Sequence, residues 1–185
     1  HPAGDDAPRE WAAHVRLVDV RGVRLKTEGI VEVLGGDYLF TVEARLGPDG
    51  RGVKSAPRPK DWQIHGAEWA ATGDGAAGRG ASIDLRAVAT RSRDVLRLDV
   101  HERLSTDLLE TYSCGHVEIP LGDLPVVRDP ADGREPPSCL RTFTIKRRPF
   151  FKERETDNGT LRAAVWLQPK TKESRKLRKA LAGWQ

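Results

Sequence analysis

The sequence contains no methionine and only two cysteines, Cys114 and Cys139, in 185 residues. Cysteine this sparse is typical of a reducing compartment and not of a disulfide-built secreted domain, so we expect an intracellular, cytoplasmic protein. No run of about 18 apolar residues occurs, and a transmembrane segment is therefore not expected. Because the chain starts at His1-Pro2 without a methionine, we expect a piece of a longer parent protein.

Aromatic residues are also scarce, at 6% of the chain. Arginines outnumber lysines 22 to 9 and the pI is about 9.3, which would suit phosphate binding. However, no strand pattern shows the paired exposed aromatics on which nucleic-acid-binding modules stack bases. We therefore regard nucleic acid as an unlikely partner.

Motifs that carry catalysis are missing as well. The five histidines occur in separate segments without a His-x-Glu-x-x-His or nucleophile-elbow motif. Cys114 has no recognisable catalytic partner pattern and is interpreted as a small buried thiol. The glycine-rich stretch from Gly73 to Gly80 lacks the Gly-Lys-Ser/Thr of a phosphate-binding loop. We expect a protein that is not an enzyme and that uses no cofactor.

Charge is unevenly distributed along the chain. Residues 138–185 contain 13 Lys/Arg and 4 Asp/Glu, a net charge of +9, whereas residues 1–137 carry a net charge of −5. A basic block of this kind favours anionic partners such as acidic lipid headgroups, nucleic acid or an acidic protein surface. A solvated basic surface without a partner is the alternative.

Alternation of apolar and polar residues predicts about eight strands. The clearest pattern runs from Tyr38 to Leu46, where every second residue is apolar and can face a core. Turn-forming residues separate the strands, and no helix long enough for a parallel crossover lies between them. The predicted fold is an all-β, eight-stranded antiparallel β-sandwich. The predicted strands cover residues 14–20, 38–46, 61–65, 83–88, 96–100, 117–121, 140–146 and 161–167.

The C-terminal tail has a helical pattern. Leu177, Leu181 and Trp184 form one apolar stripe, with lysines and arginines around it, so residues 170–185 are predicted to form a short basic amphipathic helix. This helix would bind a membrane surface or a partner, or it would pack as an end of the domain or start a linker. Residues 1–13 are predicted to be an N-terminal extension, and residues 14–169 the sandwich.

Several stretches, in the right order, resemble the C2 domain, an eight-stranded sandwich that docks proteins on membranes or on one another. Cys114-Gly115 and the strand ending Ile119-Pro120-Leu121 are similar to the family's Ile-Gly and Ile-Pro-Leu. Asp37-Tyr38 resembles its Asp-Pro-Tyr-Val without the proline, and Gly159-Thr160-Leu161 resembles its last strand. Trp62 or Trp69 would occupy its Pro-x-Trp position. An immunoglobulin-type or other sandwich is the alternative.

The resemblance implies an incomplete calcium site. Calcium needs about six to eight oxygen ligands, and in the family these are mainly aspartates from two loops. Asp37 matches one such position, but His101-Glu102 stands where an Asp-x-Asp is usual, and a histidine nitrogen suits calcium poorly. The first loop offers Glu28 and Glu32 but no aspartate, and Asp107 would stand in for the later aspartate of the second loop. We therefore expect no metal and calcium-independent action.

Without calcium, lipid attraction must come directly from Lys and Arg. The strongest cluster is Lys146, Arg147 and Arg148, and Phe150 and Phe151 beside it would either insert into the headgroup region or plug the core. The resemblance also implies a basic patch on one sheet, with Lys54, Arg58, Lys60 and Arg86 as candidates. The predicted function is a module that docks its parent peripherally on anionic phospholipid membranes, either phosphoinositide or another acidic lipid. A protein scaffold without lipid binding is the alternative, with a protein as the partner.

Overall fold

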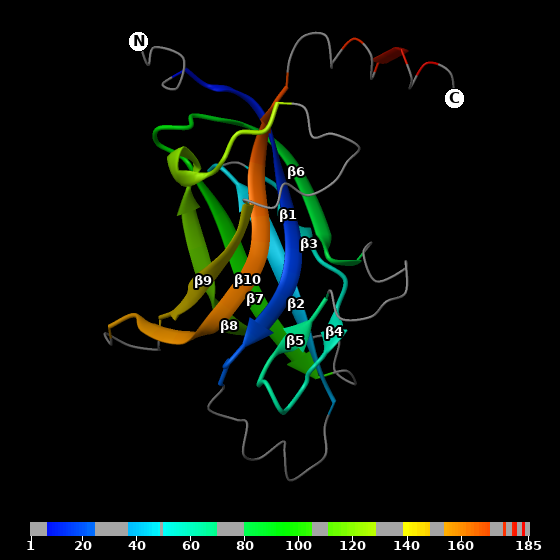
Figure 1. The fold of residues 1–185 in the computed structure, drawn as a ribbon, viewed down its shortest axis with the longest axis vertical. Coiled ribbons are helices and arrows are strands. Elements are labelled where there is room, and N and C mark those ends of the chain that lie inside the picture. The colour runs from blue at the N-terminus through cyan, green and yellow to red at the C-terminus, as the bar shows by residue number, and fades with distance from the viewer. Residues whose placement is uncertain are drawn as a thin grey trace.

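The structure is a computed structural model, and its described part is built from antiparallel strands (Figure 1). It describes residues 7–24, 37–48, 50–69, 80–104, 111–128, 139–148 and 154–170, together with residues 176, 179, 180 and 183. The strands are β1 (Arg9–Arg21), β2 (Tyr38–Leu46), β3 (Val53–Lys54), β4 (Arg58–Pro59), β5 (Ala67–Glu68), β6 (Ser82–Ala89), β7 (Val95–Leu104), β8 (Thr111–Pro120), β9 (Leu140–Arg147) and β10 (Thr156–Pro169), and the 3-10 helix η1 spans Leu121–Asp123.

The alternating pattern produces these strands, because successive side chains of a strand point to opposite faces. In β2 the inward residues Phe40, Val42 and Ala44 are all 0% exposed, while the residues between them are partly exposed. In β7, Leu96, Leu98 and Val100 are likewise 0% exposed, and they alternate with polar side chains. One face of each strand is therefore fixed in a common core, which also sets its register.

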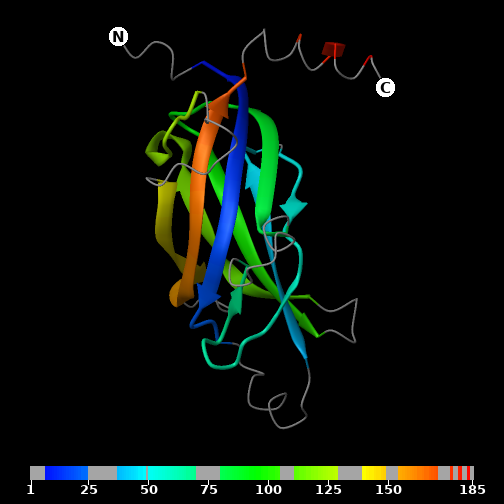
Figure 2. The same ribbon diagram turned by 45° about the vertical axis from the view of Figure 1, so that its right-hand side comes forward.

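The strand order is β3-β2-β7-β8-β9-β10-β1-β5, with β4 also paired to β2 and β6 to β1. Figures 1 and 2 show two layers, one containing β2, β7 and β8 and the other β9, β10, β1 and β6. In the described residues the layers are joined by one antiparallel pair, His116 of β8 with Lys146 of β9. We call this junction the seam. The apolar core lies between the layers and contains residues from both.

The all-β antiparallel prediction is confirmed, but the eight-stranded count is not. The described residues contain ten strands, of which β3, β4 and β5 have two residues each. Residues 61–65, predicted as a strand, form a turn closed by the Asp61–Gly66 bridge. β1 begins at Arg9, within the predicted N-terminal extension, because Trp11 and Ala13 add buried side chains to the core.

The predicted C-terminal helix lies largely outside the described residues, as do Leu177, Leu181 and Trp184. The four described residues after Lys170 are exposed, and the amide of Gly183 donates to the carbonyl of Lys179 at 3.1 Å. The amphipathic helix therefore stays a prediction. No helix of the described residues has the length and apolarity that a membrane crossing requires.

Candidate functional site

Polar side chains cover the outer side of the β3-β2-β7-β8 layer and continue across the seam. The register aligns one row of ionisable residues across six strands, in the order Lys54, Glu43, Asp99, His116, Lys146 and Asp157. The adjacent row contains Arg45, Arg97 and Glu118. Directly opposed residues of neighbouring strands share a face, so these two rows form one surface. We call it the polar face.

Ion pairs organise this face. Arg97 Nε donates to both oxygens of Asp99, at 3.1 and 3.2 Å, and Arg97 Nη1 donates to Glu118 Oε1 at 3.1 Å. His116 Nε2 lies 3.2 Å from Glu155 Oε1. The hydrogen bond of Lys146 to Asp157 raises the pKa of Lys146 above its ordinary value, so this lysine stays charged at neutral pH.

A close approach of backbones creates the seam. Gly115 has φ +133°, and a Cβ there would lie 2.5 Å from the carbonyl oxygen of Lys146. The carbonyl of the preceding Cys114 accepts a 2.8 Å hydrogen bond from the buried side chain of Asn158 in β10. The glycine thus allows β8 to contact β9 at one point, and Asn158 ties β8 to the second layer.

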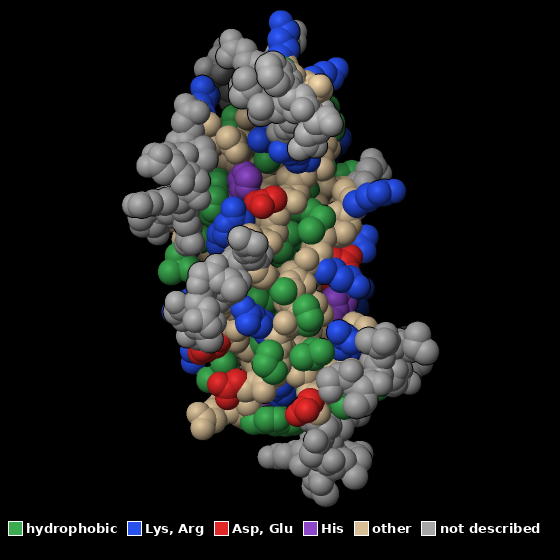
Figure 3. Space-filling model, turned by 90° about the vertical axis from the view of Figure 1, so that its right-hand side faces the viewer, with side chains coloured by type: hydrophobic (Ala, Val, Ile, Leu, Met, Phe, Trp, Pro, Cys, Tyr) green, Lys and Arg blue, Asp and Glu red, His purple; other side chains and the backbone are tan. Residues whose placement is uncertain are grey.

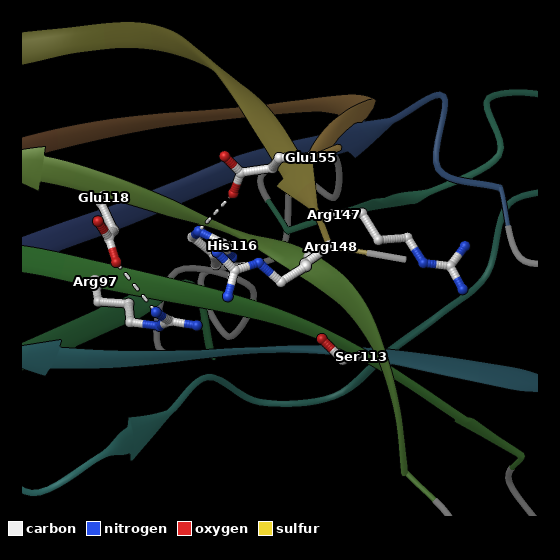
Figure 4. Close-up of a pocket in the computed structure, with 8 residues that line it drawn as sticks. Arg97, Ser113, His116, Glu118, Arg147, Arg148 and Glu155 are labelled. Carbon is white, nitrogen blue, oxygen red and sulfur yellow. Dashed lines mark hydrogen bonds and ion pairs between the residues drawn. The ribbon is translucent and has the colours of Figure 1, made fainter. Parts of the chain in front are cut away.

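A cavity of about 530 Å³ opens at the seam. Strands β7, β8 and β9 contribute to it, together with Arg148 just after β9 and Glu155 just before β10 (Figure 4). Its lining residues are Arg97, Ser113, Gly115, His116, Glu118, Arg147, Arg148 and Glu155. We call this cavity the seam pocket. A second cavity of about 410 Å³ lies beside it and shares His116, Glu118 and Glu155.

The structure brings four of the seven predicted lipid-binding residues to this region. Arg147 and Arg148 line the seam pocket, Lys146 lies at the seam, and Lys54 stands in the same row four strands away. At about 4.8 Å per strand, the path along the sheet from Lys54 to Lys146 is roughly 19 Å. Phe150 and Phe151, the predicted membrane-contact residues, lie outside the described residues.

The other three predicted residues do not join the polar face. Lys60 has a side chain 1% exposed, and its Nζ donates to the buried Glu102 at 3.1 Å. Arg58 is paired with the inward-facing Phe40, so it belongs to the inner side of the sheet. Arg86 is exposed on β6 in the other layer. The sequence pattern could not place Arg58 and Lys60, because β4 has only two residues and shows no alternation. Only the pairing of β6 with β1 shows that Arg86 belongs to the other layer.

The residues compared above with a calcium loop are also placed differently. β7 continues to Leu104, so His101 and Glu102 lie in a strand and not in the loop. Glu102 is 0% exposed and forms an ion pair with Lys60. The Nζ of Lys60 also lies 4.3 Å from the centre of the Trp62 ring. Asp37 is exposed, and Glu28, Glu32 and Asp107 lie outside the described residues. Within the described residues, no group of three or more His, Cys, Asp or Glu could hold a metal ion.

Sequence reasoning missed Arg97, Glu118 and His116 as parts of the site. Their alternation with buried residues marked them as outward-facing, but only the pairing of β7 with β8 and of β8 with β9 brings them beside Arg148. On the face that Figure 3 shows, on the β6 side, Lys and Arg side chains are spread among hydrophobic, neutral, acidic and histidine side chains.

No protein-family model matches the sequence, and no curated protein matches it significantly. Among solved structures, the first C2 domain of plant extended synaptotagmin 1 is similar, with a TM-score of 0.54 and 17% identity over 90% of this chain and 99% of that chain. Human GIVD cytosolic phospholipase A2 has a TM-score of 0.49 and 14% identity, over 89% of this chain and 16% of that chain. The fold assignment rests on the synaptotagmin match and on the strand order above. The chain is therefore a C2-like domain by its fold.

Proposed function

We propose that this chain is a non-catalytic module that docks its parent protein peripherally on anionic phospholipid membranes, on the cytoplasmic side and without calcium. The polar face would be the docking surface, with the seam at its centre. The observation that carries the proposal is that Arg97, Arg147 and Arg148 all border one cavity of that face. The fold is that of domains such as the C2 domain of extended synaptotagmin, which makes a docking role a natural candidate.

The cations of the seam differ in how far neighbouring groups neutralise them. Lys146 is paired with Asp157, and Arg97 with Asp99 and Glu118. Arg148 forms no ion pair within the described residues, and Arg147 Nη1 donates to the carbonyl of Arg24 at 3.4 Å. Because a free guanidinium offers its full charge to a phosphate, Arg147 and Arg148 should contribute most to docking.

The proposal can be tested with the triple variant Lys146→Ala, Arg147→Ala, Arg148→Ala. Each unpaired cation near an anionic surface contributes about 1 kcal/mol, so we expect a total loss of about 2 kcal/mol, a roughly 30-fold weaker binding. The measurement is flotation with anionic vesicles at low salt, in calcium and in chelator. Raising the salt from about 0.1 M to about 1 M shortens the Debye length from about 10 Å to about 3 Å and should remove most of the difference.

A matched control removes the same charge elsewhere. Arg9, Arg86 and Arg93 are exposed on β1, β6 and the turn after β6, and their triple alanine variant should bind vesicles nearly as the unmodified protein does. Equal losses in both triple variants would show that only net charge matters and would reject the polar face as the docking surface. If the unmodified protein bound no anionic vesicles, membrane docking itself would be rejected, and a protein partner would replace it.

A further inference from the structure

Strand β6 forms the border of its layer and has a paired strand along only one of its two edges. In Figure 1 it lies beside β1, and each residue from Ser82 to Ala89 is in register with a residue of β1. Within the described residues no other strand pairs with β6, and the backbone of residues 83–88 bonds to no other backbone segment. Because a strand directs its N–H and C=O groups to both sides, about half of those of β6 remain open to a further strand.

The outward side chains of β6 carry opposite charges two residues apart. Asp84 and Arg86 are both exposed on the outer face of the strand, and the next outward residue, Val88, is 66% exposed. One oxygen of Asp84 accepts from Arg16 at 3.0 Å and lies 2.6 Å from His14 Nδ1, yet the Asp84 side chain remains 57% exposed. A carboxylate has about four acceptor positions, so Asp84 can take a further cation.

A second copy of β6 is the strand whose charges fit this edge. In an antiparallel pair with a two-fold axis, outward side chains face outward ones, so only registers that differ by two residues are possible. With Leu85 opposite the partner's Leu85, Asp84 of each copy faces the partner's Arg86, and Val88 faces the partner's Ser82. Opposed side chains of unlike charge stabilise a strand pair. A shift by two residues in either direction would instead oppose Asp84 with Asp84 or Arg86 with Arg86, which repel.

The apolar residues of β6 suit the same register. Ile83 and Leu85 face the core, and a second copy would continue this inner face by placing the partner's Ala87 opposite Ile83. Three large apolar side chains are exposed among the described residues. Two of them lie on the side of the sandwich that Figure 3 faces, Val88 on β6 and Val53 on β3, which contacts β6. Covering apolar area on this side favours association.

We propose that two copies of this chain associate through their β6 strands, in the register that opposes Asp84 with the partner's Arg86. The two outer layers then form one continuous sheet, from β9 of one copy to β9 of the other. Strand hydrogen bonds, two symmetry-related ion pairs and the covered Val88 hold it together. A single strand pair buries less than the roughly 1,200 Å² of a standard interface, so the dimer is a weak one that forms at high local concentration. This dimer is independent of the docking function proposed for the polar face.

The register predicts which charge reversals break the dimer and which restore it. Arg86→Glu opposes two carboxylates at both symmetry-related positions, and Asp84→Lys opposes two cations. Each variant alone should therefore dimerise about 30-fold more weakly than the unmodified protein. In an equimolar mixture of the two variants, the introduced lysine faces the introduced glutamate, and the remaining Asp84 faces the remaining Arg86. Heterodimers should then form with about the unmodified affinity, as measured by sedimentation equilibrium with one variant fluorescently labelled.

Arg93→Glu is the matched control, because it makes the same change of net charge at an exposed residue in the turn after β6. It should dimerise like the unmodified protein. Urea unfolding shows whether each variant is folded, since Asp84→Lys also loses the contacts with His14 and Arg16. If Asp84→Lys did not fold, Arg86→Glu and Arg93→Glu decide between them, and equal dimerisation of these two would overturn the proposal.

Two further results would overturn it. One is a protein that stays monomeric up to roughly 1 mM, the weak end of specific association, which would leave the β6 edge to an extended segment of another protein. The other is a mixture of the two reversed variants that associates no better than its components. Amide hydrogen exchange locates the interface: at high protein concentration the amides of β6 that point away from β1 should gain protection. A dimer that protects other segments and not β6 would equally reject the assignment.

Discussion

Lys60 and Glu102 form an ion pair that is almost completely removed from water. Their side chains are 1% and 0% exposed, and Tyr38, Phe40 and Trp62 surround the ammonium at 4.3 to 5.8 Å from their ring centres. Desolvating two charges is costly, and only their mutual attraction and further contacts offset that cost. Removing one of the two charges should therefore lower the stability of the domain more than replacing both by apolar residues.

The Lys60–Glu102 pair gives a prediction for the stability of the domain. Glu102→Leu leaves a buried ammonium without its counter-charge and should lower the free energy of unfolding by about 3 to 5 kcal/mol. The double variant Lys60→Met, Glu102→Leu, which removes both charges, should be closer to the unmodified protein. Urea unfolding of Glu102→Leu, of Lys60→Met and of the double variant measures the coupling between the two groups. A double variant whose loss equals the sum of the single losses would mean that the two groups are not coupled.

Gly115 allows strand β8 to come close to the backbone of β9. Its φ of +133° and the 2.5 Å approach of an added Cβ to the Lys146 carbonyl leave no room for a side chain, because the neighbouring atom belongs to backbone. The strand has to bend here for β8 to reach β9. A change at this position acts on the junction of the two layers and on the shape of the seam pocket.

Gly115→Ala should therefore destabilise the domain by about 1 to 3 kcal/mol, through backbone strain and overpacking. Gly122→Ala is the matched control, because the nearest atom to an added Cβ there lies at 3.6 Å and its φ is not positive. Chemical denaturation of the two variants checks this expectation. If Gly115→Ala were as stable as Gly122→Ala, the close approach at the seam would not be a constraint.

At the scale of the whole molecule, the polar face should respond to pH through His101 of β7, whose side chain interacts with Asp99 and Glu43 of that face. Burial lowers the pKa of His101 below its usual range, although the nearby Asp99 and Glu43 oppose this shift. In the unfolded chain the pKa is about 6.5, so between the two pKa values the unfolded state binds more protons than the folded state. Stability is therefore full above the unfolded pKa, and it is lost as the pH falls from there toward the folded pKa.

We thus predict opposite effects of acidification on the fold and on docking. Between about pH 7 and pH 5 the unmodified protein should lose stability that His101→Gln does not lose, as measured by urea unfolding at each pH. In the folded protein His101 is protonated only below its lowered pKa, so vesicle binding should strengthen once the pH falls below that value, and less so in the variant. If the two proteins showed parallel stability profiles, His101 would not be the titrating group.

Much of the fold could be predicted from the sequence, and the reasons are local. The alternation in residues 38–46 and 96–100 set which side chains of β2 and β7 face the core, because a strand has a period of two whatever its neighbours are. The cluster Lys146, Arg147 and Arg148 was visible because its members are consecutive. The two-residue strands β3, β4 and β5 were not visible, since so short a segment has no period.

The grouping of side chains from different strands was decided by the tertiary structure alone. Strand pairing and register placed Arg97, His116 and Glu118 beside Arg148, and they turned Lys60 inward to Glu102. Register depends on which strands become neighbours, and no single segment contains that information. The sequence by itself thus determined an all-β chain with a basic C-terminal part, whereas the folded layers determined which charges stand free, which are neutralised and where a pocket opens between them.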